Sequence, residues 1–337
     1  MITMEDIARI SGYSRITVSA ALRNKAGVSE KARKKIMEVA EKYNYTPNLM
    51  AMSLKGQPSH LIGVVVRDIC NPYYGLVIEG IESAVSAHGY TLLTLSTRED
   101  HEREVQALRT LSSYQVDGLI LAPILRGIDL EHIWLFSRNG KPLITFEKVP
   151  GFGFDYVDFE DEKGGYLATE YLIKKGHRRI CYLAGPETSK SSHERYEGFQ
   201  KALNAYGIAS EENRKVICGN SSHERFCAAS ALLSDPENRP TALFCFSDLV
   251  TVDVYKAAQS LGLRIPQDLS VIGFDDIELA SVLGPPLTTI SYSIYDVGHF
   301  VGAKMVDYIR HKKQINGLEK VFKPRLVERE SVATILR

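Results

Sequence analysis

From Leu61 onward, short apolar runs alternate with longer helical patterns, and no other feature constrains the fold as strongly. A first series has apolar runs at 61–66, 90–96, 118–122 and 142–146, with helical patterns at 75–88 and 102–114. A second has apolar runs at 179–184, 215–218, 242–246 and 270–274, with helical patterns near 163–175, 195–206, 224–233 and 249–261. Continuous apolar runs of this length are typical of parallel strands buried on both faces. The order therefore predicts an α/β protein with two doubly wound parallel-sheet lobes.

The first sixty residues have a different pattern, with three helical segments and clear start and turn signals. These signals are Thr3 with Asp6, Gly12, Ser14 and Ser29. Ser and Thr cap helix starts, and glycine allows the positive φ of a tight turn. Two short helices around a glycine turn, backed by a third, are typical of a helix-turn-helix DNA-binding domain. A small helical bundle with a solvated polar face is the alternative.

Charge divides the chain in the same place. The formal net charge is zero, but residues 1–60 carry ten Lys and Arg against five Asp and Glu, a net charge of +5. The rest of the chain must then carry −5. A basic head on an acidic body favours a nucleic-acid-binding domain joined to a domain of another kind, although a chance cluster would give the same numbers.

Several classes of protein are disfavoured by the composition. The chain opens without a basic and apolar leader and contains no run of 18 apolar residues, so we expect a cytoplasmic protein without a membrane span. The five cysteines are odd in number and lack C-x-x-C spacing, which favours buried free thiols over a zinc site or disulfides. Catalytic signatures such as a phosphate loop or a nucleophile elbow are missing, so we expect neither an enzyme nor a cofactor or metal.

Specific motifs then narrow the class. In the first sixty residues they are Asp6-Ile7-Ala8, Ser11-Gly12-Tyr13-Ser14, Thr17-Val18-Ser19, Leu22-Arg23-Asn24, Val28-Ser29 and Tyr45-Thr46-Pro47-Asn48. Further along they are Asn71-Pro72-Tyr73-Tyr74, Gly176-His177-Arg178-Arg179-Ile180, Gly273-Phe274-Asp275-Asp276 and Pro285-Pro286-Leu287-Thr288-Thr289. In this order the motifs resemble those of the LacI/GalR family of bacterial repressors along nearly the whole chain. The resemblance implies a helix-turn-helix head, a hinge and a sensor with the type I fold of periplasmic binding proteins.

The resemblance divides the chain into three parts. We expect a DNA-binding domain at 1–46, a hinge helix and linker at 47–60, and a two-lobed effector domain at 61–337. Lobe 1 would comprise about 61–160 and 291–320, and lobe 2 about 161–290 and 321–337. The chain would therefore cross between the lobes three times.

DNA contacts are expected from the second helix and from the hinge. Arg15 can donate hydrogen bonds to the edge of a guanine, and Ile16 can make an apolar contact such as one to a thymine methyl group. Hydroxyl side chains can hydrogen-bond to phosphate oxygens. The expected set is Thr3, Ser14, Arg15, Ile16, Thr17, Ser19, Ala20, Asn24, Ala51, Leu54 and Lys55. The family implies that Leu54 wedges into the minor groove. Ala20 and Leu49 stand where relatives often carry other residues, so we expect a related but different operator.

Effector contacts are expected just past the ends of strands, in the cleft between the lobes. The predicted set is Asn71, Tyr73, Tyr74, Asp161, Arg195, Ser247 and Asp275. Asp161, Ser247 and the further residue Asp248 are the weaker candidates. The family implies ligand roles for Arg195 and Asp275. A surface tyrosine, an inter-lobe salt bridge and a capping aspartate are the alternative roles for these residues. Ser247 and Ser221 depart from sugar-sensing relatives, which speaks against a standard hexose.

Together these features predict a homodimeric repressor that reads a near-palindromic double-stranded DNA operator and responds to a small molecule. We expect a sugar or sugar derivative as effector, with a nucleobase as the alternative. A cytoplasmic solute-binding protein and a sugar or nucleotide enzyme are the rival classes.

Overall fold

The computed structural model describes residues 2–22, 26–45, 58–125, 129–186, 189–209, 215–219, 221–311 and 317–335. The chain divides into two compact units, Met1–Ser59 and His60–Arg337. None of the described helices is long and apolar enough to cross a membrane.

The first unit is a small helical domain whose described helices are α1 (Met4–Ser11), α2 (Arg15–Leu22) and α3 (Glu30–Lys42). Its core consists of Ile7, Val18, Ala21 and Ile36. The predicted turn and caps are present: Gly12 has a φ of 77°, Thr3 forms the capping box, and the Ser29 side chain caps α3.

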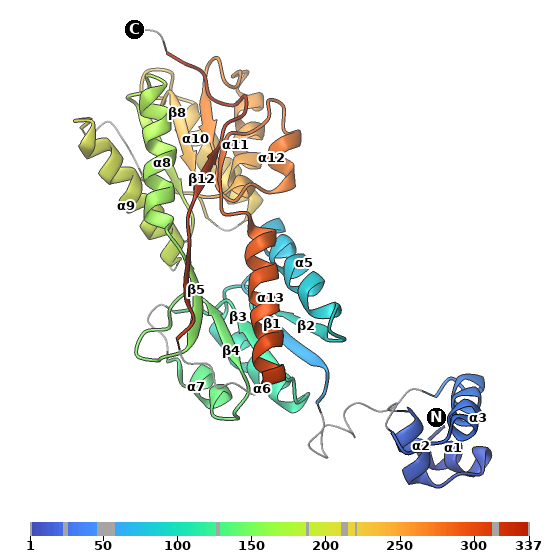
Figure 1. Ribbon diagram of the computed structural model, residues 1–337. Coiled ribbons are helices and arrows are strands. Elements are labelled where there is room, and N and C mark those ends of the chain that lie inside the picture. Colours follow the sequence, from blue (N-terminus) through green and yellow to red (C-terminus); the bar gives the residue numbers. More distant parts are fainter. Residues whose placement is uncertain are drawn as a thin grey trace. The chain divides into compact units, whose positions relative to one another are not determined.

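The first lobe of the second unit is built on a six-stranded sheet with the order β11-β5-β4-β3-β1-β2 (Figure 1). Its strands are β1 (Leu61–Val66), β2 (Thr91–Ser96), β3 (Gly118–Leu121), β4 (Leu143–Phe146), β5 (Asp155–Phe159) and β11 (Glu319–Phe322). All neighbouring pairs are parallel.

Helices cover both faces of this sheet, as doubly wound folds require. The helices are α5 (Pro72–Ser86), α13 (Ile294–His311), α6 (His101–Ser113) and α7 (Glu131–Ser137). Val64 packs in the core formed with α5 and α13, whereas its neighbour Val65 packs with Leu108 and Leu111 of α6. Strand β1 is therefore buried on both faces, which explains its continuous apolar sequence.

The second lobe has a four-stranded parallel sheet with the order β7-β6-β8-β9. Its strands are β6 (Ile180–Ala184), β7 (Lys215–Ile217), β8 (Ala242–Cys245) and β9 (Ser270–Ile272). Its helices are α8 (Asp161–Lys174), α9 (Lys190–Ala205), α10 (Ser222–Leu233), α11 (Asp248–Ser260) and α12 (Glu278–Val282). Helices α8 and α9 share a core with Tyr182 and Phe244, and α10 and α11 share one with Leu183 and Leu243.

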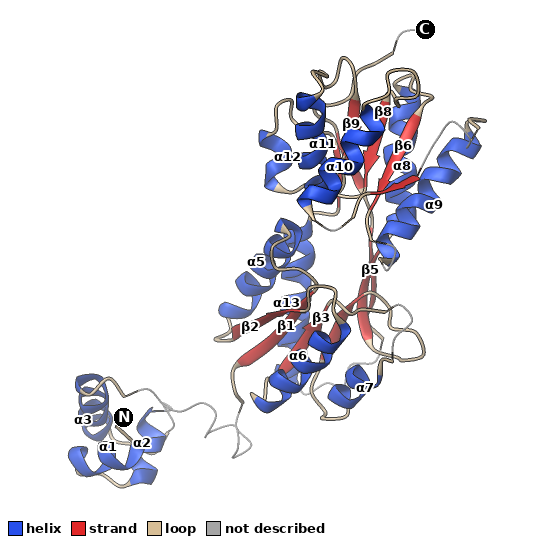
Figure 2. Cartoon of the chain, turned by 180° about the vertical axis from the view of Figure 1, so that it is seen from behind, coloured by secondary structure: helices blue, strands red, loops and turns tan. Residues whose placement is uncertain are grey.

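Three connections join the lobes. One runs from β5 into α8, and one runs from β10 (Thr289–Ser291) into α13. The third runs from β11 into β12 (Arg325–Val327), which pairs antiparallel with β10. Figure 2 shows β5 where the chain passes between the two lobes. Strand β11 reaches Phe322, so this last crossing lies slightly later than the predicted boundary at 320.

The fold class predicted from the sequence is confirmed, and one prediction about the cysteines is wrong. All five cysteines are free, but only Cys181, Cys218 and Cys245 are buried, whereas Cys70 and Cys227 are exposed. The expectation of five buried thiols overlooked that exposed helices and loops tolerate single cysteines.

Candidate functional site

The second helix of the head presents a mixed surface. Val18 and Ala21 of α2 are buried, whereas the Ile16 side chain is 83% exposed and Arg15 is exposed. The Arg15 guanidinium lies 3.9 Å from the Glu5 carboxylate, a loose contact between two exposed groups. The start of α2 is therefore free to meet base edges, as the recognition helix of a helix-turn-helix does.

Two of the predicted DNA-contacting hydroxyls already serve the helix starts. The Thr3 hydroxyl donates to Asp6 Oδ2 at 2.7 Å. The Ser14 Oγ accepts from the Thr17 amide at 3.1 Å and lies 2.9 Å from the Thr17 hydroxyl. If Thr3 or Ser14 contacted a phosphate, its hydroxyl would make that contact in addition to these hydrogen bonds. Ser19 and Ala20, which are also predicted DNA contacts, are half-buried. The remaining predicted contacts, Asn24, Ala51, Leu54 and Lys55, lie outside the described residues.

A cavity of about 340 Å³ lies between the two lobes. Its walls come from segments that directly follow the strands of both sheets, where ligands of doubly wound folds bind. All seven predicted effector residues line it: Asn71, Tyr73, Tyr74, Asp161, Arg195, Ser247 and Asp275. Its volume falls in the range of small-molecule sites.

Arg195 occupies the centre of the polar wall. Its Nε donates to Asp161 Oδ1 at 2.9 Å, and its Nη1 donates to the Phe246 carbonyl at 2.6 Å. The guanidinium also lies 3.5 Å from the centre of the Phe274 ring, within the range of a cation–π contact. A buried arginine held at these points is fixed in orientation, so its remaining donors are aimed before a ligand arrives.

Asp275 is the complementary acceptor. Its Oδ1 lies 3.6 Å from Arg195 Nη1, too far for a hydrogen bond, and no side-chain hydrogen bond of Asp275 is recorded within the described ranges of the chain. Burial raises the pKa of Asp275 well above its ordinary value. Its φ of 108° is rare for a residue with a side chain, and it holds the carboxylate at the cavity wall. A carboxylate in this position needs hydrogen-bond donors from a ligand.

The aromatic wall begins at the start of α5. The Asn71 side chain accepts a hydrogen bond from the Tyr73 amide at 3.1 Å and caps this helix. The Tyr73 and Tyr74 rings meet edge to face with centroids 5.1 Å apart. Phe146, Phe159, Phe246 and Tyr292 add further rings to the lining. The cavity therefore combines flat apolar surfaces with a few buried charges.

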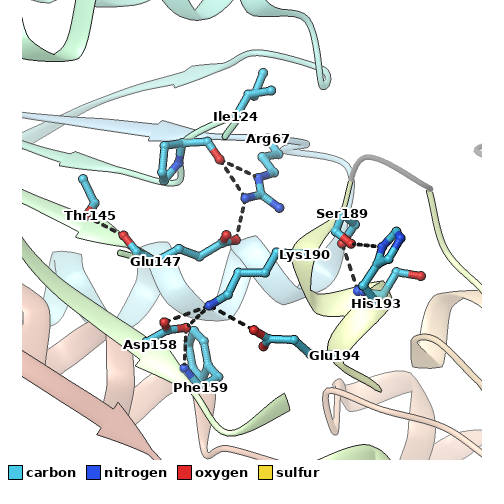
Figure 3. A network of polar contacts seen from close by, with 12 residues as sticks. Arg67, Ile124, Thr145, Glu147, Asp158, Phe159, Ser189, Lys190, His193 and Glu194 are labelled. Carbon is cyan, nitrogen blue, oxygen red and sulfur yellow. Dashed lines mark hydrogen bonds and ion pairs between the residues drawn. The ribbon is translucent and has the colours of Figure 1, made fainter. Parts of the chain in front are cut away.

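Sequence reasoning missed a second charged pair in lobe 1, shown in Figure 3. Arg67 Nη2 donates to Glu147 Oε1 at 2.5 Å and to the Pro123 carbonyl at 2.7 Å. Burial raises the pKa of Glu147, although Arg67 opposes this shift. Both residues follow strand ends, at β1 and β4, so the rule that located Asn71 would have located them.

Sequence reasoning also missed an ion pair between the lobes. Lys190 Nζ of α9 lies 2.9 and 2.8 Å from the two carboxylate oxygens of Asp158 in β5, and 3.5 Å from Glu194 (Figure 3). Burial raises the pKa of Glu194 to about 7. Lys190 and Asp158 belong to different lobes, so this pair responds to the angle between them.

One weaker candidate does not reach the cavity. The Asp248 carboxylate accepts hydrogen bonds from the Ile277 amide at 3.0 Å and from the Thr289 hydroxyl at 2.6 Å. It is absent from the cavity lining, unlike its neighbour Ser247. Asp248 therefore fixes the turn that follows β9 and does not contact a ligand in this arrangement.

A basic helix-turn-helix domain followed by a two-lobed α/β unit with a polar cavity defines a class of ligand-responsive transcription regulators. The sequence profile of bacterial regulatory proteins of the lacI family matches residues 3–48, and that of the periplasmic binding protein-like domain matches residues 169–332. The chain belongs to the LacI family, as the sequence predicted, and it is a DNA-binding transcription regulator.

Relatives match the chain from end to end. The chain is 34% identical to the HTH-type transcriptional repressor PurR of Vibrio atlanticus (strain LGP32), with 99% of this chain and 100% of the relative covered. It is also 34% identical to the ribose operon repressor of Haemophilus influenzae, with the same coverage. The lac repressor dimer bound to operator and the anti-inducer ONPF has a TM-score of 0.83 at 26% identity, covering 98% of this chain and 99% of that one.

Proposed function

We propose that the protein is a homodimeric repressor whose operator affinity is set by a small sugar or sugar derivative bound between the lobes. In this proposal residues 1–46 read DNA, 47–60 form the hinge and linker, and 61–337 bind the effector. The protein acts on cytoplasmic DNA. The single observation that carries the effector assignment is the buried pair of Arg195 and Asp275.

This pair suits neighbouring hydroxyl groups. A sugar hydroxyl both donates and accepts, so two adjacent hydroxyls can donate to Asp275 and accept from Arg195. The Asp275 carboxylate lies 3.6 Å from Arg195 Nη1, which leaves both groups with unused hydrogen-bonding capacity. A hydroxyl that satisfies a buried carboxylate recovers a large desolvation cost, so the pair selects strongly for donors at this point.

The other walls fit a ring-shaped polar molecule. Tyr73, Phe159 and Phe246 supply faces against which the apolar side of a sugar ring can pack. The ribose operon repressor of H. influenzae and a solved LacI-family regulator from Enterococcus faecium with bound ribose, 27% identical with a TM-score of 0.73, support a pentose.

A purine-like nucleobase is the second candidate, favoured by a different observation. The relatives named PurR match the whole chain, and the Tyr73 and Tyr74 rings could stack on a flat base as well as on a sugar. Asp275 would then accept a ring N–H. The two candidates differ in what Arg195 meets: hydroxyls in one case, a ring nitrogen or exocyclic oxygen in the other.

Lobe closure supplies the coupling to DNA in this proposal. The cavity walls come from both lobes, so a ligand that touches both stabilises one angle between them. The Lys190–Asp158 pair contributes to the same equilibrium from its place between the lobes. The family resemblance adds that paired hinge helices with Leu54 respond to this angle in the dimer.

The test measures operator binding and ligand binding on the same preparation. Purified protein is titrated with a palindromic family-type operator and with scrambled DNA at several salt concentrations, without ligand and with D-ribose, other monosaccharides, their phosphates, or purine bases. We expect selective, salt-dependent binding that one of the sugars changes at least about tenfold. A response only to purine bases would establish the second candidate, and equal weak binding to both DNAs under every condition would refute the repressor proposal.

A further inference from the structure

Two histidines and a glutamate meet on the helical face of lobe 1, apart from the effector cavity. His101 and Glu104 lie one turn apart at the start of α6, and His132 lies in α7. One ligand atom from each residue lies within 4.8 Å of the corresponding atoms of the other two. Imidazole nitrogens and a carboxylate oxygen are typical ligands of Zn²⁺ and related metal ions.

Glu104 is the first reason to expect a cation. Its side chain is fully buried, and its carboxylate accepts hydrogen bonds from the Ile124 amide at 2.9 Å and from His132 Nε2 at 2.7 Å. Within the described parts of the chain, the salt bridge recorded for Glu104 is the one to His132, and no Lys or Arg is paired with it. A buried carboxylate requires a counter-charge, which a bound cation would supply.

His101 is the second, independent reason. Its Nδ1 is buried and has no hydrogen-bond partner within the described residues. The ring lies edge to face with His132, with centroids 5.0 Å apart. A buried ring nitrogen without a partner costs free energy, and coordination of a metal ion removes that cost.

We propose that His101, Glu104 and His132 bind a divalent transition-metal ion, with Zn²⁺ as the best fit. Tetrahedral ligands about 2.0–2.1 Å from zinc stand about 3.3 Å apart, so the three ligand atoms, now within 4.8 Å of one another, would move closer by side-chain rotation when the ion binds. The two histidines line a second cavity of about 450 Å³, which gives the ion a route from solvent and leaves room for water as a fourth ligand. Zn²⁺ with two neutral imidazoles and one carboxylate has a net charge of +1, so Glu104 gains a counter-charge that a neutral His132 does not supply.

The ion would add a further link between two helices that are held by apolar packing and by the contact between Glu104 and His132. Leu108 and Leu111 of α6 share a core with Ile133 and Phe136 of α7. Glu104 also holds the Ile124 amide in the segment that leaves β3. Bound metal would therefore stabilise α6, α7 and this segment together, and the stabilisation would grow with free metal concentration.

The experiment uses the full chain after treatment with a chelator. Zn²⁺ binding is measured by competition with a chromophoric indicator, and the site geometry is read from the visible absorption of bound Co²⁺. We compare the wild type with H101A and H132A. Since H101A leaves the bond between His132 and Glu104 intact, the fold should survive, which circular dichroism and the melting temperature without metal would check.

A matched control comes from the exposed pair His223 and Cys227, whose Nε2 and Sγ atoms lie 3.6 Å apart and are the obvious place for adventitious binding. We expect one Zn²⁺ per chain in the wild type and in H223A, at least about 100-fold weaker binding in H101A and H132A, and a higher melting temperature with zinc only where binding persists. The proposal is overturned if the wild type binds no stoichiometric metal, if H101A and H132A bind as tightly as the wild type, or if H223A alone abolishes binding.

Discussion

Replacing Asp275 with asparagine should stabilise the ligand-free protein while impairing its response to effector. Asp161 and Asp275 both lie at Arg195, so two buried carboxylates face one guanidinium. Asp161 has the direct hydrogen bond to Arg195, whereas Asp275 lies 3.6 Å away and carries the surplus charge. Asparagine keeps the shape of the side chain and tolerates the positive φ at this position.

The magnitude follows from removing one poorly compensated buried charge. Relief of such a site is worth about 1–2 kcal/mol, and 1 kcal/mol moves the melting temperature of a domain of this size by about 2–4 °C. We therefore expect D275N to melt about 2–8 °C above the wild type at neutral pH. Among the sugars and bases tested above, we take a ligand that shifts the wild-type melting temperature. D275N loses a charge-assisted hydrogen bond to this ligand worth about 1.5–3 kcal/mol, so it should bind the ligand roughly 10- to 150-fold more weakly than the wild type.

The dependence on pH provides a sharper check. Burial raises the folded-state pKa of Asp275 above its ordinary value of 3.8, so the folded protein holds this proton more tightly than the unfolded chain does. The contribution of Asp275 to the free energy of unfolding is therefore fully present below pH 3.8, where the side chain is protonated in both states. This contribution is lost as the pH rises from 3.8 through the folded-state pKa. The difference in melting temperature between D275N and the wild type should be near zero at pH 4 and should grow toward neutral pH.

The matched control is D161N. This change removes the negative charge from the group that accepts hydrogen bonds from Arg195 Nε at 2.9 Å and from the Tyr292 hydroxyl at 3.3 Å. Arg195 then loses its directly bonded carboxylate, so the melting temperature should fall. If D275N and D161N destabilised the ligand-free protein equally, or if D275N bound ligand like the wild type, the assigned role of Asp275 would be refuted.

Three further predictions concern other parts of the chain. R15A should weaken operator binding by about 1–3 kcal/mol without changing affinity for scrambled DNA, and an equal loss on both DNAs would mean that Arg15 contacts only phosphates. K190M removes the ion pair with Asp158 and should increase the radius of gyration of the ligand-free protein, as measured by small-angle scattering. Stability should change by under about 1 kcal/mol, because the pair is partly exposed. Identical scattering of K190M and the wild type would show that the pair does not hold the lobes together. G165A places a Cβ 2.1 Å from the Arg195 carbonyl and should lower the melting temperature and weaken ligand binding, whereas G75A, whose Cβ meets nothing within 4 Å, should do neither.

The sequence predicted the four strands of the lobe 2 sheet and β1 to β4 of the lobe 1 sheet, because buried parallel strands leave a continuous apolar signal. Strand β1 was predicted at its exact bounds, whereas α9 begins at Lys190, five residues before the predicted start. Strands β5, β10, β11 and β12 were not predicted. They are short and partly polar, and apart from the pairing of β5 with β4 their pairing depends on segments far away in the sequence.

The candidate site was predicted in part, and the reason differs from residue to residue. Arg195 and Asp275 came from family motifs, and Tyr73 from its place after a strand. Arg67 was missed although it follows the same strand, because a single arginine has no motif and its partner Glu147 is distant in sequence. Asp248 was overestimated because the sequence does not show that its carboxylate turns toward Thr289.

The packing of α13 against β1 and α5 has a consequence for synthesis of the protein. Val301 of α13 belongs to the same core as Val64 of β1 and Ile81 of α5, and Figure 1 shows α13 beside α5. A growing chain therefore makes strands β1 to β5 of lobe 1 and most of lobe 2 before α13, which covers one face of the lobe 1 sheet together with α5, leaves the ribosome. The head, whose core is local, can fold from the start. During synthesis the DNA-binding domain is thus folded for a long interval while the sheet of lobe 1 still lacks α13. The apolar sheet face exposed in this interval is a surface that chaperones can protect.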